Sequence, residues 1–243
     1  MRANWKFSDL VALYLTTMVV ALSLWTVLAI ALGPARTASR PEELLAAAQE
    51  PESAWILATL LAGALTLLSL WVLGNRFRWT LPELGLHTFR LVEMVTLGVV
   101  VGAVAFGFGL LVLLAVGWLI QGSASTAMLL RVFPVRATDP LWVLIVPTLL
   151  VLNPLGAELF FRGMFYRYAR ARWRPRVALW VTALFFALAS GTIGPTASLV
   201  LLGAVNCLLF ERTGSLVPGI AANSTLGLAM VLWALIQQAT LGL

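Results

Sequence analysis

The sequence has little charge for its size, and it contains a single cysteine, Cys207, and a single histidine, His87. Charged residues make up 11% of the 243 residues, and hydrophobic residues make up 61%. Because a soluble domain carries about 25% charged residues, a soluble globular protein, a disordered chain and a secreted disulfide scaffold are excluded. One cysteine excludes an internal disulfide and a cysteine-based metal site. One histidine excludes the HExxH zinc motif and any multi-histidine site within the chain.

The sequence contains several long apolar runs with few charged residues. About 20 apolar residues in a helix cross the ~30 Å hydrocarbon core of a bilayer, and unbroken runs are typical of helices rather than of alternating barrel strands. The sequence therefore predicts an all-α, polytopic transmembrane helical bundle of about seven segments. These are Leu10–Leu32, Trp55–Leu73, Met94–Ile120, Leu141–Gly156, Val177–Gly194, Pro195–Phe210 and Leu216–Ile236.

Basic residues are distributed unevenly between the loops. With a cytoplasmic N-terminus, the positive-inside rule places most of the 16 Lys and Arg residues on the cytoplasmic side, including Arg162 and the five arginines of Arg167–Arg176. This explains the net charge of +6 without a nucleic-acid partner. The C-terminus is then external. Richness in Leu, Ala and Arg favours a bacterial source, so we expect the chain in a bacterial cytoplasmic (inner) membrane, in contact with membrane lipid.

The chain divides into two parts on composition. Residues 1–75 hold two helices and an acidic external loop, and residues 76–243 hold a transmembrane core. Within this core, Gly98 and Gly102 place two small residues on one helix face. They predict close helix packing, either within the chain or in a dimer.

One carboxylate lies where apolar residues are expected. Glu158 follows the fourth apolar run, and acidic residues in membrane segments are functional candidates by default. Arg162, four residues on, shares a helix face with it, so a structural ion pair near the helix end and proton or substrate chemistry both stay open. Asn153-Pro154 and Pro218-Gly219 predict helix bends with polar neighbours. A site is therefore expected in the C-terminal half.

Three stretches together resemble the CPBP family, the CAAX protease and bacteriocin-processing (Abi) intramembrane proteases. Ala157–Gly163 (A-E-L-F-F-R-G) resembles the E-E-x-x-x-R box of that family, and Leu184–Ser190 resembles its F-x-x-x-H box. Ala222–Gly227, after the R-T-G-S-L stretch of residues 212–216, resembles its H-x-x-x-N box. Leu81–Leu86 is similar to a short loop before the family's core. The resemblance covers about residues 81–228 and implies an intramembrane endopeptidase fold.

The departures from these boxes bear on catalysis. The resemblance implies six site positions, occupied here by Ala157, Glu158, Arg162, Ser190, Asn223 and Gly227. The family's first Glu, thought to activate water, is replaced by alanine, and both of its histidines and its asparagine are replaced as well. Peptide hydrolysis needs a base and oxyanion donors, so none of the six positions is assigned a catalytic role. No cofactor and no metal is expected, and His87 lies in a predicted cytoplasmic loop.

Three functions remain open at this point. The first is a pseudoprotease, a binding or scaffold subunit of a membrane complex, with a transmembrane protein partner or a prenyl, lipid or peptide ligand. The second is an active intramembrane endopeptidase of the CAAX or leader-peptide type, which needs Glu158 to be free to act on water. The third is a bacteriocin self-immunity protein.

Overall fold

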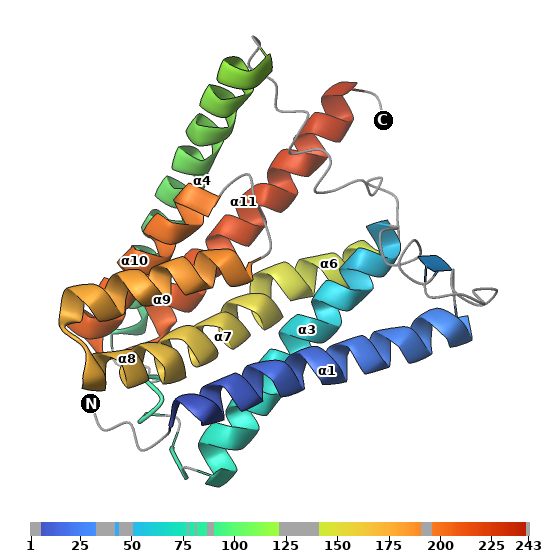
Figure 1. Ribbon diagram of the computed structural model, residues 1–243. Coiled ribbons are helices and arrows are strands. Elements are labelled where there is room, and N and C mark those ends of the chain that lie inside the picture. Colours follow the sequence, from blue (N-terminus) through green and yellow to red (C-terminus); the bar gives the residue numbers. More distant parts are fainter. Residues whose placement is uncertain are drawn as a thin grey trace.

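The computed structural model describes residues 6–32, 42–43, 51–76, 78–80, 82–86, 90–121, 141–190 and 196–241. Over these ranges the chain is helical and contains no strand, which confirms the predicted all-α bundle (Figure 1). Its seven helical stretches are α1 (Phe7–Leu32), α3 (Pro51–Trp71, extended by a π-helical turn to Arg76), α4 (Leu91–Gln121), the composite α6–α8 (Trp142–Arg172), α9 (Pro175–Ala189), α10 (Thr196–Thr213) and α11 (Val217–Leu241). His87 and most of the acidic loop lie outside the described residues.

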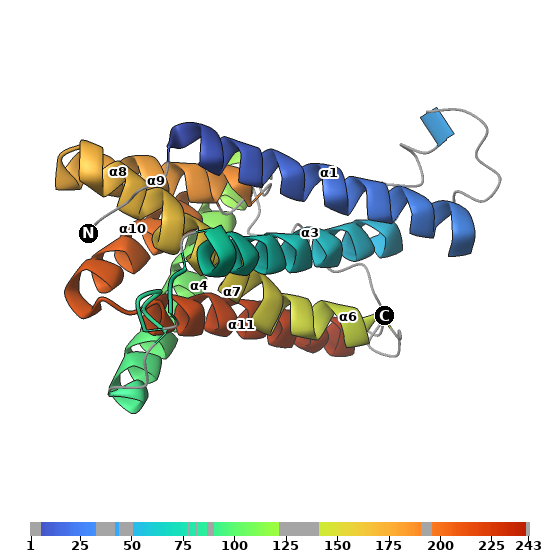
Figure 2. The same cartoon turned by 90° about the horizontal axis from the view of Figure 1, so that it is seen from below.

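Five of these stretches are long and apolar enough to cross a membrane: α1, α3, α4, the α6–α8 helix and α11. The apolar helix α9 is shorter, with 15 residues, which span about 22 Å. It packs against α10 as a helical pair. The start of α1 and the end of α11 lie at opposite ends of the bundle in both views (Figures 1 and 2), as an N-in, C-out arrangement requires.

The fourth helix is much longer than its apolar run indicates. The sequence predicts its end at Gly156, but the helix continues to Arg172. It is built from α6 (Trp142–Pro147), α7 (Asn153–Ala157) and α8 (Arg167–Arg172), joined by π-helical segments at Thr148–Leu152 and Glu158–Tyr166. The predicted end was wrong because Glu158 and Arg162, which lower the hydropathy there, bind each other inside the protein. Arg162 is buried in mid-helix, so it does not belong to the charge at the cytoplasmic end.

Pro154 interrupts the hydrogen bonds of this helix, and a neighbouring helix compensates. Proline has no N–H to bond the carbonyl four residues earlier, which here is that of Leu150. The Ser224 hydroxyl, from α11, donates to this carbonyl at 2.7 Å. On the other side, the Thr66 hydroxyl of α3 donates to the Leu152 carbonyl at 2.9 Å. The carbonyl freed by Pro154 thus joins α11 to the long helix, and the Leu152 carbonyl joins α3 to it.

The arginine-rich end of the long helix is held by polar and aromatic contacts. Arg167 donates to the Glu83 carbonyl at 3.0 Å and stacks on the Trp79 ring. Arg170 pairs with Glu211 of α10, and Arg172 stacks on Tyr168. Three of the arginines therefore have structural contacts, in addition to the positive charge that they place at this end of the bundle.

Two short loops that the sequence singled out contact each other at the same end. Gly85 has a positive φ of 84°, which glycine adopts without strain. Its carbonyl accepts hydrogen bonds from the Leu216 N–H at 2.9 Å and from the Ser215 hydroxyl at 2.8 Å. The loop before α4 is thereby fixed to the start of α11.

Gly98 and Gly102 pack α4 against α11 within the chain, which is one of the two alternatives left open by the sequence. A Cβ atom at Gly98 would lie 2.3 Å from the Pro218 carbonyl oxygen. A Cβ atom at Gly102 would lie 2.3 Å from the Ala222 carbonyl oxygen. The two helix backbones can approach this closely only because both side chains are absent.

Replacing Gly102 with alanine is expected to lower the stability of the protein by about 1–3 kcal/mol, because the added methyl group meets backbone rather than a movable side chain. Gly107→Ala on the same helix is the matched control. Nothing lies within 4 Å of a Cβ atom there, so alanine should be neutral or slightly stabilising. Thermal unfolding in mild detergent measures both variants, and equal melting temperatures would contradict this packing.

Candidate functional site

A partly open cavity of about 420 Å³ lies between the helices, within the range of small-molecule sites. Its wall includes Ala157, Ser190, Asn223 and Gly227, four of the six site positions that the family resemblance implies. The long helix, the end of α9 and α11 bring these four residues together. The described lining residues include no Asp, Glu, His, Lys or Arg.

The N-terminal helices form the opposite part of the wall. Tyr14 and Met18 of α1 line the cavity, together with Trp55 and Ala58 of α3. The expectation that a site lies in the C-terminal half alone was therefore incomplete. The apolar face that these helices turn to the cavity has the same composition as a lipid-facing one, so the sequence carried no signal for it.

Glu158 and Arg162 lie behind the cavity wall, and neither lines it. The Arg162 Nη1 atom donates to Glu158 Oε1 at 2.9 Å, as the spacing of four residues predicted. Only 1% of Glu158 and none of Arg162 is exposed. The pair is not near a helix end, as the sequence suggested, but in the middle of the continuous helix.

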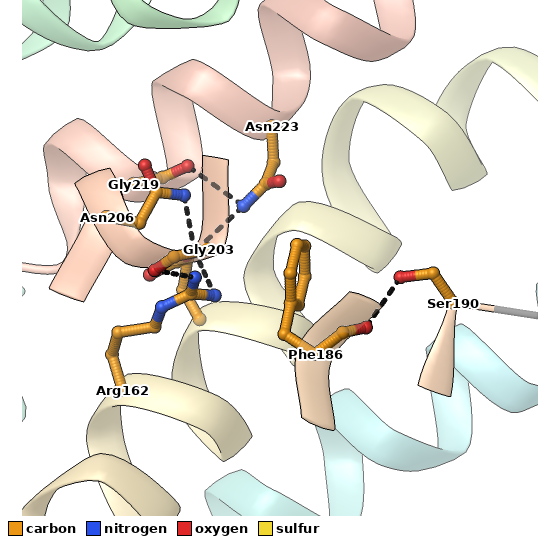
Figure 3. A network of polar contacts seen from close by, with 8 residues as sticks. Arg162, Phe186, Ser190, Gly203, Asn206, Gly219 and Asn223 are labelled. Carbon is orange, nitrogen blue, oxygen red and sulfur yellow. Dashed lines mark hydrogen bonds and ion pairs between the residues drawn. The ribbon is translucent and has the colours of Figure 1, made fainter. Parts of the chain in front are cut away.

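Two asparagines from other helices complete the surroundings of the carboxylate (Figure 3). Asn206 of α10 and Asn223 of α11 donate through Nδ2 to Glu158 Oε1, at 3.1 and 2.8 Å. One carboxylate oxygen thus joins the long helix, α10 and α11. The signal in the sequence for Asn206 is its position as a polar residue within an apolar helical segment.

Arg162 has two further partners that fix its guanidinium. Its Nη2 atom donates to the Gly203 carbonyl of α10 at 2.9 Å, and its Cζ atom lies 4.6 Å from the centre of the Phe186 ring of α9. The buried charge is therefore compensated by a carboxylate, a carbonyl and an aromatic face. Arg162 connects α9 and α10 to the long helix.

Gly219 gives α11 its close approach to this network. A Cβ atom at this position would lie 2.4 Å from Glu158 Oε2 and 2.6 Å from Cδ. The sequence predicted a helix bend at Pro218-Gly219, and this was wrong. The helix begins at Val217, so Pro218 occupies the first turn, where its missing N–H has no partner to lose.

The polar groups that face the cavity at the four family positions are hydrogen-bond acceptors. The Asn223 Nδ2 atom donates hydrogen bonds to Glu158 Oε1 at 2.8 Å and to the Gly219 carbonyl at 3.1 Å. Both of its N–H groups have an acceptor, and its Oδ1 atom points away from the carboxylate (Figure 3). Ser190 donates its only proton to the Phe186 carbonyl at 2.8 Å. Ala157 and Gly227 offer no polar side-chain atom.

Gly227 marks a second close contact of α11. A Cβ atom there would lie 2.7 Å from the Leu149 carbonyl oxygen, in the π-helical segment of the long helix. An asparagine, which the resemblance expects here, does not fit without a shift of backbone. No three Asp, Glu, His or Cys side chains meet anywhere in the described part of the chain, and Cys207 is a buried free thiol.

Comparison with known families matches residues 139–229 to the type II CAAX prenyl endopeptidases, Rce1-like. This region is therefore similar to the Rce1-like family. All six site positions fall inside it. The Rce1-like region begins just before α6 and ends within α11, so α1, α3 and α4, which supply the rest of the cavity wall, lie outside it. No curated protein and no solved structure matches the chain significantly.

Proposed function

We propose that this membrane protein is a noncatalytic member of the Rce1-like family, which binds a ligand or partner in its cavity and does not cut it. In this proposal it acts as a binding or scaffold subunit of a complex in a bacterial cytoplasmic membrane. The observation that carries the proposal is the combination of a 420 Å³ cavity with four family positions that face it without a base and without an unengaged side-chain donor.

The first support is that no Asp, Glu, His or Lys is found among the described residues that line the cavity. A general base must reach a water molecule within about 3 Å and hold a proton in the transition state. Glu158, the residue after the lining residue Ala157, is turned into the protein, where its Oε1 atom accepts from Arg162, Asn206 and Asn223. It is next to Ala157 in the sequence, but its side chain points about 100° away around the helix.

The direction of the hydrogen bonds is the second support. A tetrahedral oxyanion needs donors that are not already engaged. Asn223 and Ser190 occupy the positions where the resemblance expects histidines. Asn223 donates to the Glu158 carboxylate and the Gly219 carbonyl, and Ser190 donates to the Phe186 carbonyl. Loss of a base and of an oxyanion donor together costs roughly 10⁴-fold or more in rate.

The test is a cleavage assay with a fluorogenic farnesylated CAAX peptide and the purified full chain in mild detergent, with an active family enzyme as positive control. We expect wild-type cleavage to equal that of Glu158→Gln and to stay at the no-protein background. Mass spectrometry of the same tagged preparation, for proteins and lipids together, should find a stoichiometric partner or a bound apolar ligand.

Cleavage above background that Ala58→Phe abolishes would overturn the proposal. This substitution adds a ring to the wall of the cavity away from the Glu158 network, so its effect does not depend on folding of the Glu158→Gln variant. A protein that is inactive and also free of partners and ligands would contradict the binding role. The active endopeptidase alternative predicts the first of these outcomes.

A further inference from the structure

The turn between α8 and α9 presents positive charge directly beside an exposed apolar helix face. We propose that this surface binds one anionic phospholipid, whose headgroup phosphate lies at Arg174 and Arg176 and whose acyl chain lies along α9. The turn lies at the outer end of the bundle in both views (Figures 1 and 2). None of the described residues that line the cavity belongs to this surface, so the lipid site does not depend on the proposed noncatalytic role.

A proline sets the geometry of the turn. The helix α8 ends at Arg172, and α9 begins at Pro175. A residue before proline is disfavoured in the helical conformation, and Arg174 accordingly has a ψ angle of 147°. Only Trp173 and Arg174 therefore separate the two helices, and the arginines on both sides of the turn lie in one short stretch of chain.

The arginines of α8 before the turn are engaged within the protein. Arg170 pairs with Glu211 of α10, and Arg172 stacks on the Tyr168 ring. These contacts hold the end of α8 in place. They also mean that the charge of Arg170 is already neutralised by a carboxylate.

The two following arginines differ from those of α8. Arg174 and Arg176 are exposed, and no acidic side chain in the described part of the chain forms an ion pair with either of them. Basic residues at a membrane surface attract anionic headgroups. A guanidinium group also binds phosphate oxygens through two parallel N–H donors. The turn therefore offers two free guanidinium groups, two positions apart in the sequence, to a phosphate.

An exposed apolar face of α9 continues from these arginines. Its large hydrophobic side chains follow the first one by three, four, seven and eleven residues, a spacing that places them on one side of a helix. They are Val177, Trp180, Val181, Leu184 and Leu188. The opposite side of α9 packs against α10. The exposed face is thus available to an acyl chain whose headgroup lies at the turn.

Charge and apolar surface together match an anionic phospholipid. A free phosphate or an acidic peptide would use the arginines and leave the apolar face of α9 uncovered. A zwitterionic lipid carries its own positive charge beside its phosphate, so it gains less from the arginines. Trp173, in the turn itself, is 40% exposed, and tryptophan is enriched at the level of the lipid headgroups.

Native mass spectrometry of the full chain in an uncharged detergent measures binding of the first lipid molecule. The probes are a phosphatidylglycerol and a phosphatidylcholine with the same acyl chains. We expect the phosphatidylglycerol to bind more tightly. Arg174→Gln and Arg176→Gln should each weaken its binding about fivefold, the contribution of one basic residue near a membrane surface, and leave binding of the phosphatidylcholine unchanged. Both variants should melt with the wild type in detergent alone, because both side chains are exposed.

Arg78→Gln is the charge-matched control. Arg78 is exposed and precedes Trp79, which stacks on Arg167 of α8, so it lies at the same end of the bundle but outside the turn. Its replacement should weaken binding of the phosphatidylglycerol by less than about twofold, because exposed charges that are far from the lipid are screened. Ala58→Phe, which changes the cavity wall, should leave binding of both lipids unchanged.

Equal binding of the two lipids would overturn the proposal, and so would an Arg78→Gln effect as large as that of Arg176→Gln. Both results would mean that the arginines act only through the overall charge of this end. Displacement of the phosphatidylglycerol by equal concentrations of glycerol 1-phosphate or of an oligoglutamate peptide would also overturn it, because neither competitor has an acyl chain. Cleavage of the farnesylated peptide would overturn the noncatalytic role and leave this lipid site intact.

Discussion

Replacing Arg162 with alanine is expected to lower the free energy of unfolding by about 3–5 kcal/mol, because it leaves a buried carboxylate without its counter-charge. Glu158 is 1% exposed and cannot turn to water. The substitution also removes the hydrogen bond to the Gly203 carbonyl and the contact with the Phe186 ring. The long helix would therefore lose the polar contacts that Arg162 makes with α9 and α10 at the same time.

Two further variants separate charge from size in this experiment. Arg162→Lys keeps the positive charge but cannot reach both Glu158 and Gly203 with a fixed planar fork, so a smaller loss is expected. Glu158→Gln combined with Arg162→Met removes both charges and should recover part of the stability. Arg176→Ala, at an exposed position, is the control for loss of an arginine. Melting temperature in detergent is the readout, and an Arg162→Ala protein that melts with the wild type would contradict a structural role for the pair.

The helices themselves could be predicted from the sequence because burial in lipid leaves a strong compositional signal. Every predicted apolar run corresponds to a helical stretch among the described residues. The error at the end of the fourth run has a specific cause. Hydropathy counts Glu158 and Arg162 as separate charges, whereas the structure joins them into a neutral pair that an apolar interior tolerates.

At the site, only contacts between residues close together in the sequence could be predicted. Glu158 and Arg162 are four residues apart, so one helix turn brings them together. Asn206 and Glu158 are 48 residues apart, and their contact depends on the packing of α10 against the long helix. The cavity wall from α1 and α3 was missed for a related reason, since apolar residues that face a cavity and those that face lipid have the same composition.

Gly219 was singled out in the sequence as part of a predicted helix bend, but the structure requires it for close packing. Beside Pro218 it suggested a bend, but α11 runs through it as a regular helix from Val217 to Leu241. Its function in the structure is steric. Without a side chain, the helix backbone lies against the Glu158 carboxylate, and Asn223, one turn later, can donate to the same group.

Replacing Gly219 with alanine is therefore expected to lower the free energy of unfolding by about 3–5 kcal/mol. Overpacking contributes about 1–3 kcal/mol, and loss of a hydrogen bond to the charged carboxylate contributes about 1.5–3 kcal/mol. The new methyl group would lie 2.4 Å from Glu158 Oε2. The carboxylate cannot move aside, because Arg162, Asn206 and Asn223 hold its other oxygen.

Gly63→Ala is the matched control, since nothing lies within 4 Å of a Cβ atom at that helical position. It should leave stability unchanged or raise it by up to about 1 kcal/mol. A second test uses Gly219→Ala together with Glu158→Ala, which removes the group that the methyl meets. If the clash with the carboxylate is the cause, the two substitutions together will cost less than the sum of their separate effects. Strict additivity would mean that α11 does not depend on Gly219 for its contact with Glu158.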